Sequence, residues 1–97
     1  MSSIEDKRDI YIENLEDHIN DGMEADFLIN GLFTLSVTGD LIEEDEINLP
    51  MILTIDINSN LTNSEVLTEL VNKAQELVDT YDTSSKKIRI RINPPQL

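Results

Sequence analysis

The residues of this chain whose chemistry is most concentrated are carboxylates. In the predicted first helix, Asp9, Glu13 and Glu16 or Asp17 follow one another at intervals of three or four residues. On a helix this spacing places the side chains in a row on one face, about 5–6 Å apart. The pitch is close to that of successive phosphates along a nucleic-acid strand. The row therefore indicates a surface that could face positive charge, or a solvated helix face without a partner.

A second acidic cluster falls between two predicted strands. It comprises Asp40, Glu43, Glu44, Asp45 and Glu46. Carboxylate oxygens suit Ca²⁺ or Mg²⁺, but the segment lacks the spacing of an EF-hand loop and its central glycine. We therefore expect weak, nonspecific cation binding and no dedicated metal site. Since blocks of like charge are frequent interaction surfaces, this cluster is a second candidate for partner binding.

The sequence offers little for catalysis. His18 is the single histidine, and cysteine is absent. Neither a Cys–His pair nor a multi-histidine metal site can form from this composition. The chain has three glycines and none of the phosphate-binding or nucleophile-elbow motifs. We predict that the protein is not an enzyme and uses no cofactor, and that His18 is a helix-edge residue with acidic neighbours.

Charge is unevenly distributed along the chain. Twenty acidic residues against seven basic ones give a net charge of −13 over 97 residues. All the acids lie in residues 1–82, whereas residues 83–97 contain Lys86, Lys87, Arg89 and Arg91 and no acid. A general DNA or RNA binder is excluded, because its affinity depends on neutralising phosphates with lysine and arginine. No stretch of about 20 apolar residues and no signal-peptide pattern occurs, so we expect a cytoplasmic protein without a membrane span.

The first half of the chain predicts a helix and two strands within a single domain, residues 1–97. Helical spacing of apolar residues predicts a helix over residues 4–20, capped by Ser3 and stopped at Asp21–Gly22. Alternating residues predict a strand over 27–38, with a bend at Gly31, and a second strand over 49–58. Pro50 favours an edge position there, because it cannot donate a ladder hydrogen bond. The two strands are expected to form an antiparallel hairpin.

The second half predicts a helix and a third strand. A helix over 63–81 is indicated by a capping-box pattern from Thr62 to Glu65 and by a continuous apolar stripe. A strand over 86–92 presents Lys87, Arg89 and Arg91 outward, where they can pair with acids such as Asp56. Residues 93–97 are expected to form a short tail.

The element order is α-β-β-α-β, which predicts a two-layer α+β sandwich. A three-stranded mixed sheet has one apolar face, and both helices cover that face. The helical crossover makes the third strand parallel to the second. Its place, either beside the second strand or beyond the first, is left open by the sequence.

In size, acidity and α+β make-up, the chain is similar to the small phage-encoded DNA-mimic and anti-CRISPR inhibitors. The resemblance is one of composition and involves no shared motif. The carboxylate rows themselves predict an inhibitor that places them in the basic cleft of a nucleic-acid-binding protein, such as a nuclease or CRISPR effector, and the resemblance assigns no role to individual residues. Such a protein would be a monomer or homodimer in the cytoplasm, the host's if phage-encoded, and would bind neither nucleic acid nor membrane.

Three other interpretations remain open. An immunity protein or antitoxin that blocks a basic nuclease toxin would use the same carboxylates. A structural or assembly module would instead bind a protein partner through exposed apolar residues such as Ile42, Ile47 and Ile52. A housekeeping domain with incidental charge would need no partner for its acids. Binding through charge weakens with added salt, whereas binding through an apolar surface does not. Ionic strength therefore separates an inhibitor that binds through its carboxylates from an assembly module.

Overall fold

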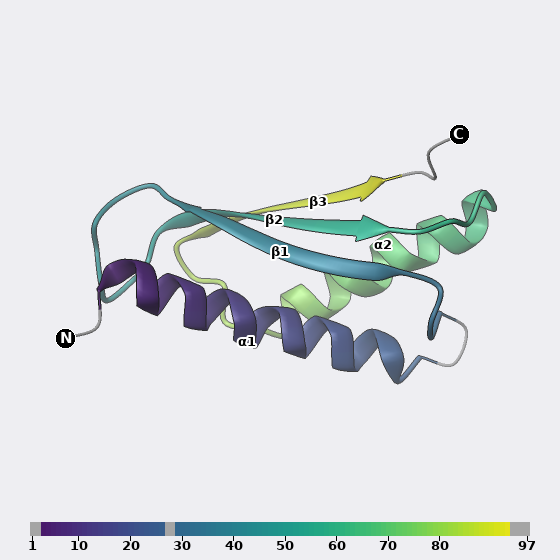
Figure 1. Cartoon of the computed structure of the whole chain (residues 1–97), viewed down its shortest axis with the longest axis horizontal. Helices are drawn as coiled ribbons and strands as arrows, with labels where there is room; N and C mark the ends of the chain where they lie inside the picture. The colour runs from purple at the N-terminus through teal and green to yellow at the C-terminus, as the bar shows by residue number, and fades with distance from the viewer. Residues whose placement is uncertain (1–2, 27–28, 94–97) are drawn as a thin grey trace.

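The chain folds into two helices and one three-stranded sheet in the predicted order α-β-β-α-β (Figure 1). The computed structural model describes residues 3–26 and 29–93. Its elements are α1 (Ile4–Glu24), β1 (Thr34–Leu41), β2 (Met51–Asn58), α2 (Ser64–Asp79) and β3 (Lys86–Asn93). The predicted α+β class and mixed sheet are confirmed.

The sheet has the order β1-β2-β3. β1 pairs antiparallel with β2 and β2 pairs parallel with β3, so that Val37, Ile55 and Ile90 share one rung. The third strand therefore lies beside the second. The edge position inferred from Pro50 is wrong, because β2 is the central strand. Pro50 precedes the first residue of β2, and its carbonyl accepts a hydrogen bond from the Ile42 N–H at 2.8 Å.

The core lies on one face of the sheet, where alternate residues of β2 are fully buried. Both helices lie against this face (Figure 1), and each contributes three buried residues to the same core. The opposite face carries mainly polar residues and is open to solvent. The buried apolar residues are Leu15, Ile19, Met23, Ile29, Leu35, Val37, Met51, Leu53, Ile55, Ile57, Leu70, Ala74 and Val78.

α1 begins as predicted and ends later. The Ser3 hydroxyl accepts the Asp6 N–H at 3.1 Å, and the Asp6 carboxylate accepts the Ser3 N–H, which completes a capping box. The predicted stop at Asp21–Gly22 is wrong, since the helix continues to Glu24. Gly22 allows a close approach to α2: a Cβ added there would lie 2.3 Å from Leu77 Cδ2. The glycine therefore serves packing between the helices.

β1 is shifted relative to its predicted bounds. It begins at Thr34 and extends to Leu41, whereas the prediction covered residues 27–38. Residues 29–32 form turns, and Gly31 has the positive φ of 77° that glycine adopts at low cost. Residues 27 and 28, which the prediction included in the strand, lie outside the described residues.

Two further boundaries differ by one residue. Asn63 caps α2 in place of the predicted Thr62, because its side-chain oxygen accepts the N–H groups of Glu65 at 2.9 Å and Val66 at 3.4 Å. Asn93, assigned to the tail, is the last residue of β3. Its side-chain amide donates to Asn58 Oδ1 at 2.9 Å, which holds it in the sheet. The remaining predicted tail, 94–97, lies outside the described residues.

Candidate functional site

A groove runs between α1 and the free edge of β1. It has a volume of about 620 Å³ and is open to solvent. The four candidate acids of the first helix contribute to its wall together with the middle of β1. Its lining residues are Arg8, Asp9, Ile12, Glu13, Glu16, Asp17, Val37, Thr38 and Gly39. The carboxylate row therefore lies beside exposed strand backbone.

A second groove, of about 420 Å³, continues along the same junction. Its lining residues are Ile4, Glu5, Arg8, Asp40, Leu41, Ile42, Glu43 and Glu44. The two grooves share Arg8, and they follow each other along β1 from Gly39 to Asp40. They form one surface because α1 lies along β1 (Figure 1).

The carboxylates of this surface are called the acidic track. They are Glu5, Asp9, Glu13, Glu16, Asp17, Asp40, Glu43 and Glu44. Between Glu5 and Asp17 the helix rises about 18 Å. Sequence reasoning identified seven of the eight acids but treated the helix row and the loop cluster separately. Glu5 was missed, although its four-residue interval from Asp9 would have extended the row.

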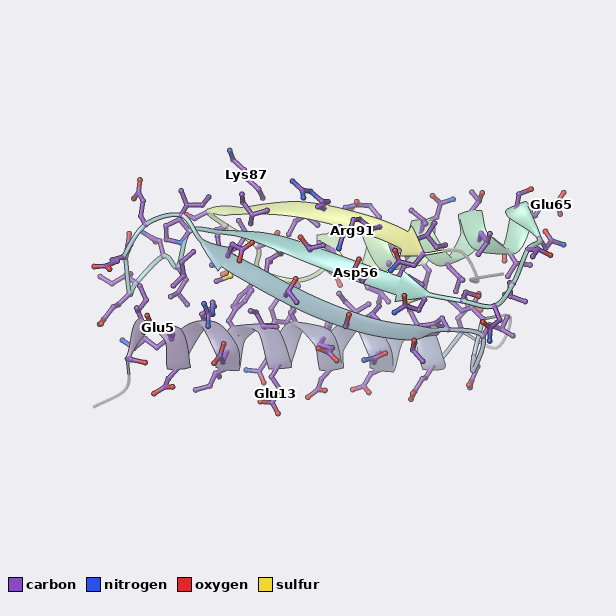
Figure 2. The ribbon with its side chains drawn as sticks, turned by 45° about the horizontal axis from the view of Figure 1, so that its top comes forward. Glu5, Glu13, Asp56, Glu65, Lys87 and Arg91 are labelled. Atoms are coloured by element: carbon purple, nitrogen blue, oxygen red, sulfur yellow. The ribbon has the colours of Figure 1, made fainter. Side chains whose placement is uncertain are left out.

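Most carboxylates of the track have no partner in the described part of the chain. Among the described residues, a hydrogen bond or ion pair involves two of the eight. Asp9 is 3.1 Å from the Arg8 guanidinium, and half-buried Glu16 accepts the Val37 N–H at 3.4 Å. Figure 2 shows Glu13 and Lys87 on opposite sides of the molecule. The track therefore presents largely uncompensated negative charge.

Two of the predicted acids lie outside the track. Asp45 accepts hydrogen bonds from the N–H groups of Ile47 and Asn48 and from the Asn48 side chain, at 2.9 to 3.1 Å. These bonds, those from Asn48 foremost, lower the pKa of Asp45 and assign it to the turn. Glu46 pairs with Lys7 at 3.2 Å and so links the loop to α1. Both residues shape the loop that carries Glu43 and Glu44.

The basic stripe of β3 lies on the opposite face of the sheet from the helices. As predicted, Arg91 pairs with Asp56, its neighbour on β2, through Nε–Oδ1 at 2.8 Å and Nη2–Oδ2 at 3.1 Å. The hydrogen bonds from Arg91 lower the pKa of Asp56. Figure 2 shows this pair on the face that also carries Lys87. These cations therefore do not neutralise the track.

His18 lies at the edge of α1 and packs against the end of α2. Its Nε2 lies 3.0 Å from the Leu77 carbonyl oxygen and 2.9 Å from Thr80 Oγ1, at the end of α2. The ring also packs on Tyr81, with centroids 5.0 Å apart. Nearby, the Tyr11 hydroxyl donates to the Asp82 carbonyl at 2.6 Å, and burial raises the pKa of Tyr11 to about 12. This cluster joins α1 to the connection between α2 and β3.

Neither a metal-ion site nor a membrane-spanning helix occurs in the described part of the chain. Within residues 3–26 and 29–93, no three potential ligands are grouped so as to hold a metal ion. In that same part of the chain, neither helix has the length and apolar character needed to cross a bilayer.

Comparisons of the chain with protein-family models, with curated proteins and with solved structures give no significant match.

Proposed function

We propose that this chain is a small, non-catalytic acidic inhibitor. It acts in the cytoplasm by placing its acidic track in the basic cleft of a nucleic-acid-binding protein, such as a nuclease or CRISPR effector. One observation carries the proposal: acids from α1, the end of β1 and the following loop line one surface, and six of these eight have no partner among the described residues.

The energetics of the track favour a role in recognition. Like charges at helical neighbour spacing destabilise a helix by about 0.2–0.5 kcal/mol per pair, and α1 carries several such pairs, with Lys7 and Arg8 as its two basic residues besides His18. A partner with a positively charged cleft would remove this repulsion on binding. Complementary fields also accelerate encounter and disfavour wrong partners. Because the track and nucleic acid would use the same cleft, binding would be competitive.

The test is displacement of a labelled DNA duplex from a panel of purified nucleases and CRISPR effectors, with nuclease toxins included. We expect the chain to displace DNA from at least one target, with an affinity that falls steeply between about 50 and about 300 mM NaCl. Inhibition of a toxin would assign the chain as an immunity protein or antitoxin acting through the same track. Failure to displace DNA from any target, or displacement insensitive to salt, would contradict the proposal.

A second candidate function is an assembly module with an apolar interface. It is favoured by Ile47, which is 91% exposed, and by Ile42, which is 48% exposed in the same loop. Ile52, the third apolar residue predicted for such an interface, is half-buried on β2. For this function, Ile47→Ser would abolish partner binding and added salt would not. For the proposed inhibitor, Ile47→Ser would leave DNA displacement within about twofold, because a singly exposed apolar side chain is ordinary on protein surfaces.

A further inference from the structure

Within residues 3–26 and 29–93, no strand pairs with the outer edge of β1. β1 is the first strand in the order β1-β2-β3 and pairs on one side with β2. Two hydrogen bonds fix the direction of its backbone groups. The Ile42 N–H, just beyond the strand, bonds to Pro50 on the β2 side, whereas the Val37 N–H bonds to Glu16 of α1. Odd-numbered residues of β1 therefore direct their backbone toward the groove, since these directions alternate along a strand.

Three further N–H groups face this edge. They belong to Leu35, Gly39 and Leu41, and no hydrogen bond satisfies them among the described residues. Protein edge strands are commonly protected by lysine, proline or a bulge. The sequence of β1, TLSVTGDL, contains neither lysine nor proline, and its register with β2 is uninterrupted. The edge is thus available for pairing with another extended chain.

The acids of α1 have a spacing that suits such a chain. Glu5, Asp9 and Glu13 follow at four-residue intervals, which corresponds to a rise of about 6 Å per interval. Side chains on one face of an added strand would repeat every two residues, or about 6.6–6.8 Å. Consecutive same-face side chains of the added strand would therefore meet consecutive carboxylates of the helix.

We infer that β1 binds an extended segment of its partner that carries lysine or arginine at alternate positions. The segment adds as a fourth strand to the β1 edge, with its basic side chains on the helix side against the acidic track. Glu16 holds the Val37 N–H at 3.4 Å, longer than the usual 2.9 Å or so. It releases that donor to a carbonyl of the segment and turns to the nearest cation. The inference rests on the proposed function and identifies the part of the partner that is recognised.

A second copy of this chain is the less favourable occupant. Its β3 also carries alternating basic residues, Lys87, Arg89 and Arg91, on an open edge. However, each copy has a net charge of −13, so two copies repel one another. In addition, Arg91 is already held by Asp56. An external basic segment has neither disadvantage.

The experiment is an NMR titration of the full, isotopically labelled chain with a capped eight-residue peptide that alternates threonine and lysine. The control peptide has the same composition in two blocks, four threonines followed by four lysines. We expect the alternating peptide to bind at least about tenfold more tightly, because it alone combines strand pairing with the helix spacing. Its binding should protect the Leu35, Val37, Gly39 and Leu41 amides from hydrogen exchange.

Backbone methylation of the peptide tests strand pairing directly. One set of alternate peptide amides must face β1 and the other must face solvent. Of two peptides N-methylated at all lysines or at all threonines, one should therefore lose binding by at least about tenfold while the other retains it. Equal binding of both, or of the alternating and block peptides, would overturn the inference and leave the proposed function standing, since attraction would then be by charge alone.

The protein side of the titration uses two matched variants. Asp9→Lys/Glu13→Lys reverses two track acids four residues apart, and Glu65→Lys/Glu69→Lys reverses an exposed pair with the same spacing on α2. The first should abolish binding of the alternating peptide, and the second should leave its site of binding unchanged. Concentration-dependent protection of β1 amides without peptide would overturn the inference in favour of a second copy. The proposed function has its own test, since it fails if the wild-type chain does not displace DNA from any target, whatever the peptide titration shows.

Discussion

The two edge strands of the sheet present charge in opposite ways. On β3 the charges are basic and belong to the strand itself, and Arg91 is held by Asp56 from the neighbouring strand. On β1 the exposed side chains are Thr34, Ser36, Thr38 and Asp40, so the strand itself carries one charge, and most of the negative charge comes from α1 beside it. Most of that charge has no partner among the residues that the structure describes. The β3 stripe thus stabilises the sheet, whereas the β1 side keeps its charge available for another molecule.

The two edge strands also differ in how closely a helix packs on them, as the rung of Gly39, Leu53 and Ile88 shows. A Cβ at position 39 would lie 2.9 Å from Ile12 Cδ1 and from Met51 Sδ, so α1 occupies the space of a side chain there. Ile88, at the other end of the rung, is half-buried. Close contact of α1 with β1 thus brings the carboxylates next to the open backbone.

The first prediction breaks the close contact between α1 and β1. Valine favours strands, but in Gly39→Val its side chain would collide with Ile12 of α1, which already fills the space next to Gly39. We expect a loss of about 1–3 kcal/mol in the free energy of unfolding, as for other overpacked sites. The matched change on the opposite edge, Ile88→Val, should remove about 0.5 kcal/mol, the low end for this deletion. Urea denaturation measures both, and a Gly39→Val protein as stable as the wild type would contradict the packing described.

The second prediction concerns the compensated charge of the β3 side. The pKa of Asp56 is lowered in the folded protein by Arg91, so the pair stabilises the fold above the unfolded-state pKa of about 3.9. This contribution is lost as pH falls through the lowered folded pKa. Asp56→Asn should reduce the thermal midpoint at pH 5–7 by a few degrees at most. The difference from wild type should shrink below about pH 4, and a difference that grows in acid would reverse this account of the pair.

The third prediction concerns the uncompensated charge of the β1 side and has the smallest effect. Glu13→Gln/Asp17→Gln removes a like-charge pair from α1 and should stabilise the fold by about 0.2–0.5 kcal/mol at low ionic strength. Added salt should reduce the gain, because it screens the same repulsion. Thermal melts at two salt concentrations test this, with Glu65→Gln/Glu69→Gln as the matched pair on α2. If neutralisation instead destabilises the protein, these carboxylates have partners that the structure does not show.

The order of elements and the sidedness of the strands were predictable because they depend on local periodicity. Alternation in residues 51–57 identified the buried face of the central strand, and Ser3 with its neighbours marked the start of α1. The end of α1 was not predictable, because Gly22 is retained for contact with Leu77, a residue 55 positions away. The cap of α2 was missed because Thr62 and Asn63 are both capable N-caps, and backbone geometry selects Asn63.

The candidate site was predictable in part for the same reason. Helical spacing alone places Asp9, Glu13 and Glu16 in one row. Their union with Asp40, Glu43 and Glu44 depends on α1 lying along β1, which no local pattern encodes. Asp45 could have been recognised as a turn residue, since aspartate commonly accepts backbone N–H groups of the residues that follow it.

The central claim is that the carboxylates beside β1 act in binding because of where they lie, beyond their contribution to net charge. The most direct measurement compares Asp9→Lys/Glu13→Lys with Glu65→Lys/Glu69→Lys in DNA displacement from the target, since both variants change the net charge equally. We predict that the first loses about 30-fold or more in affinity, while the second stays within about threefold. Equal losses of affinity in the two variants, with both still folded, would contradict the claim. Binding would then depend on the net charge of the protein and not on the position of these carboxylates.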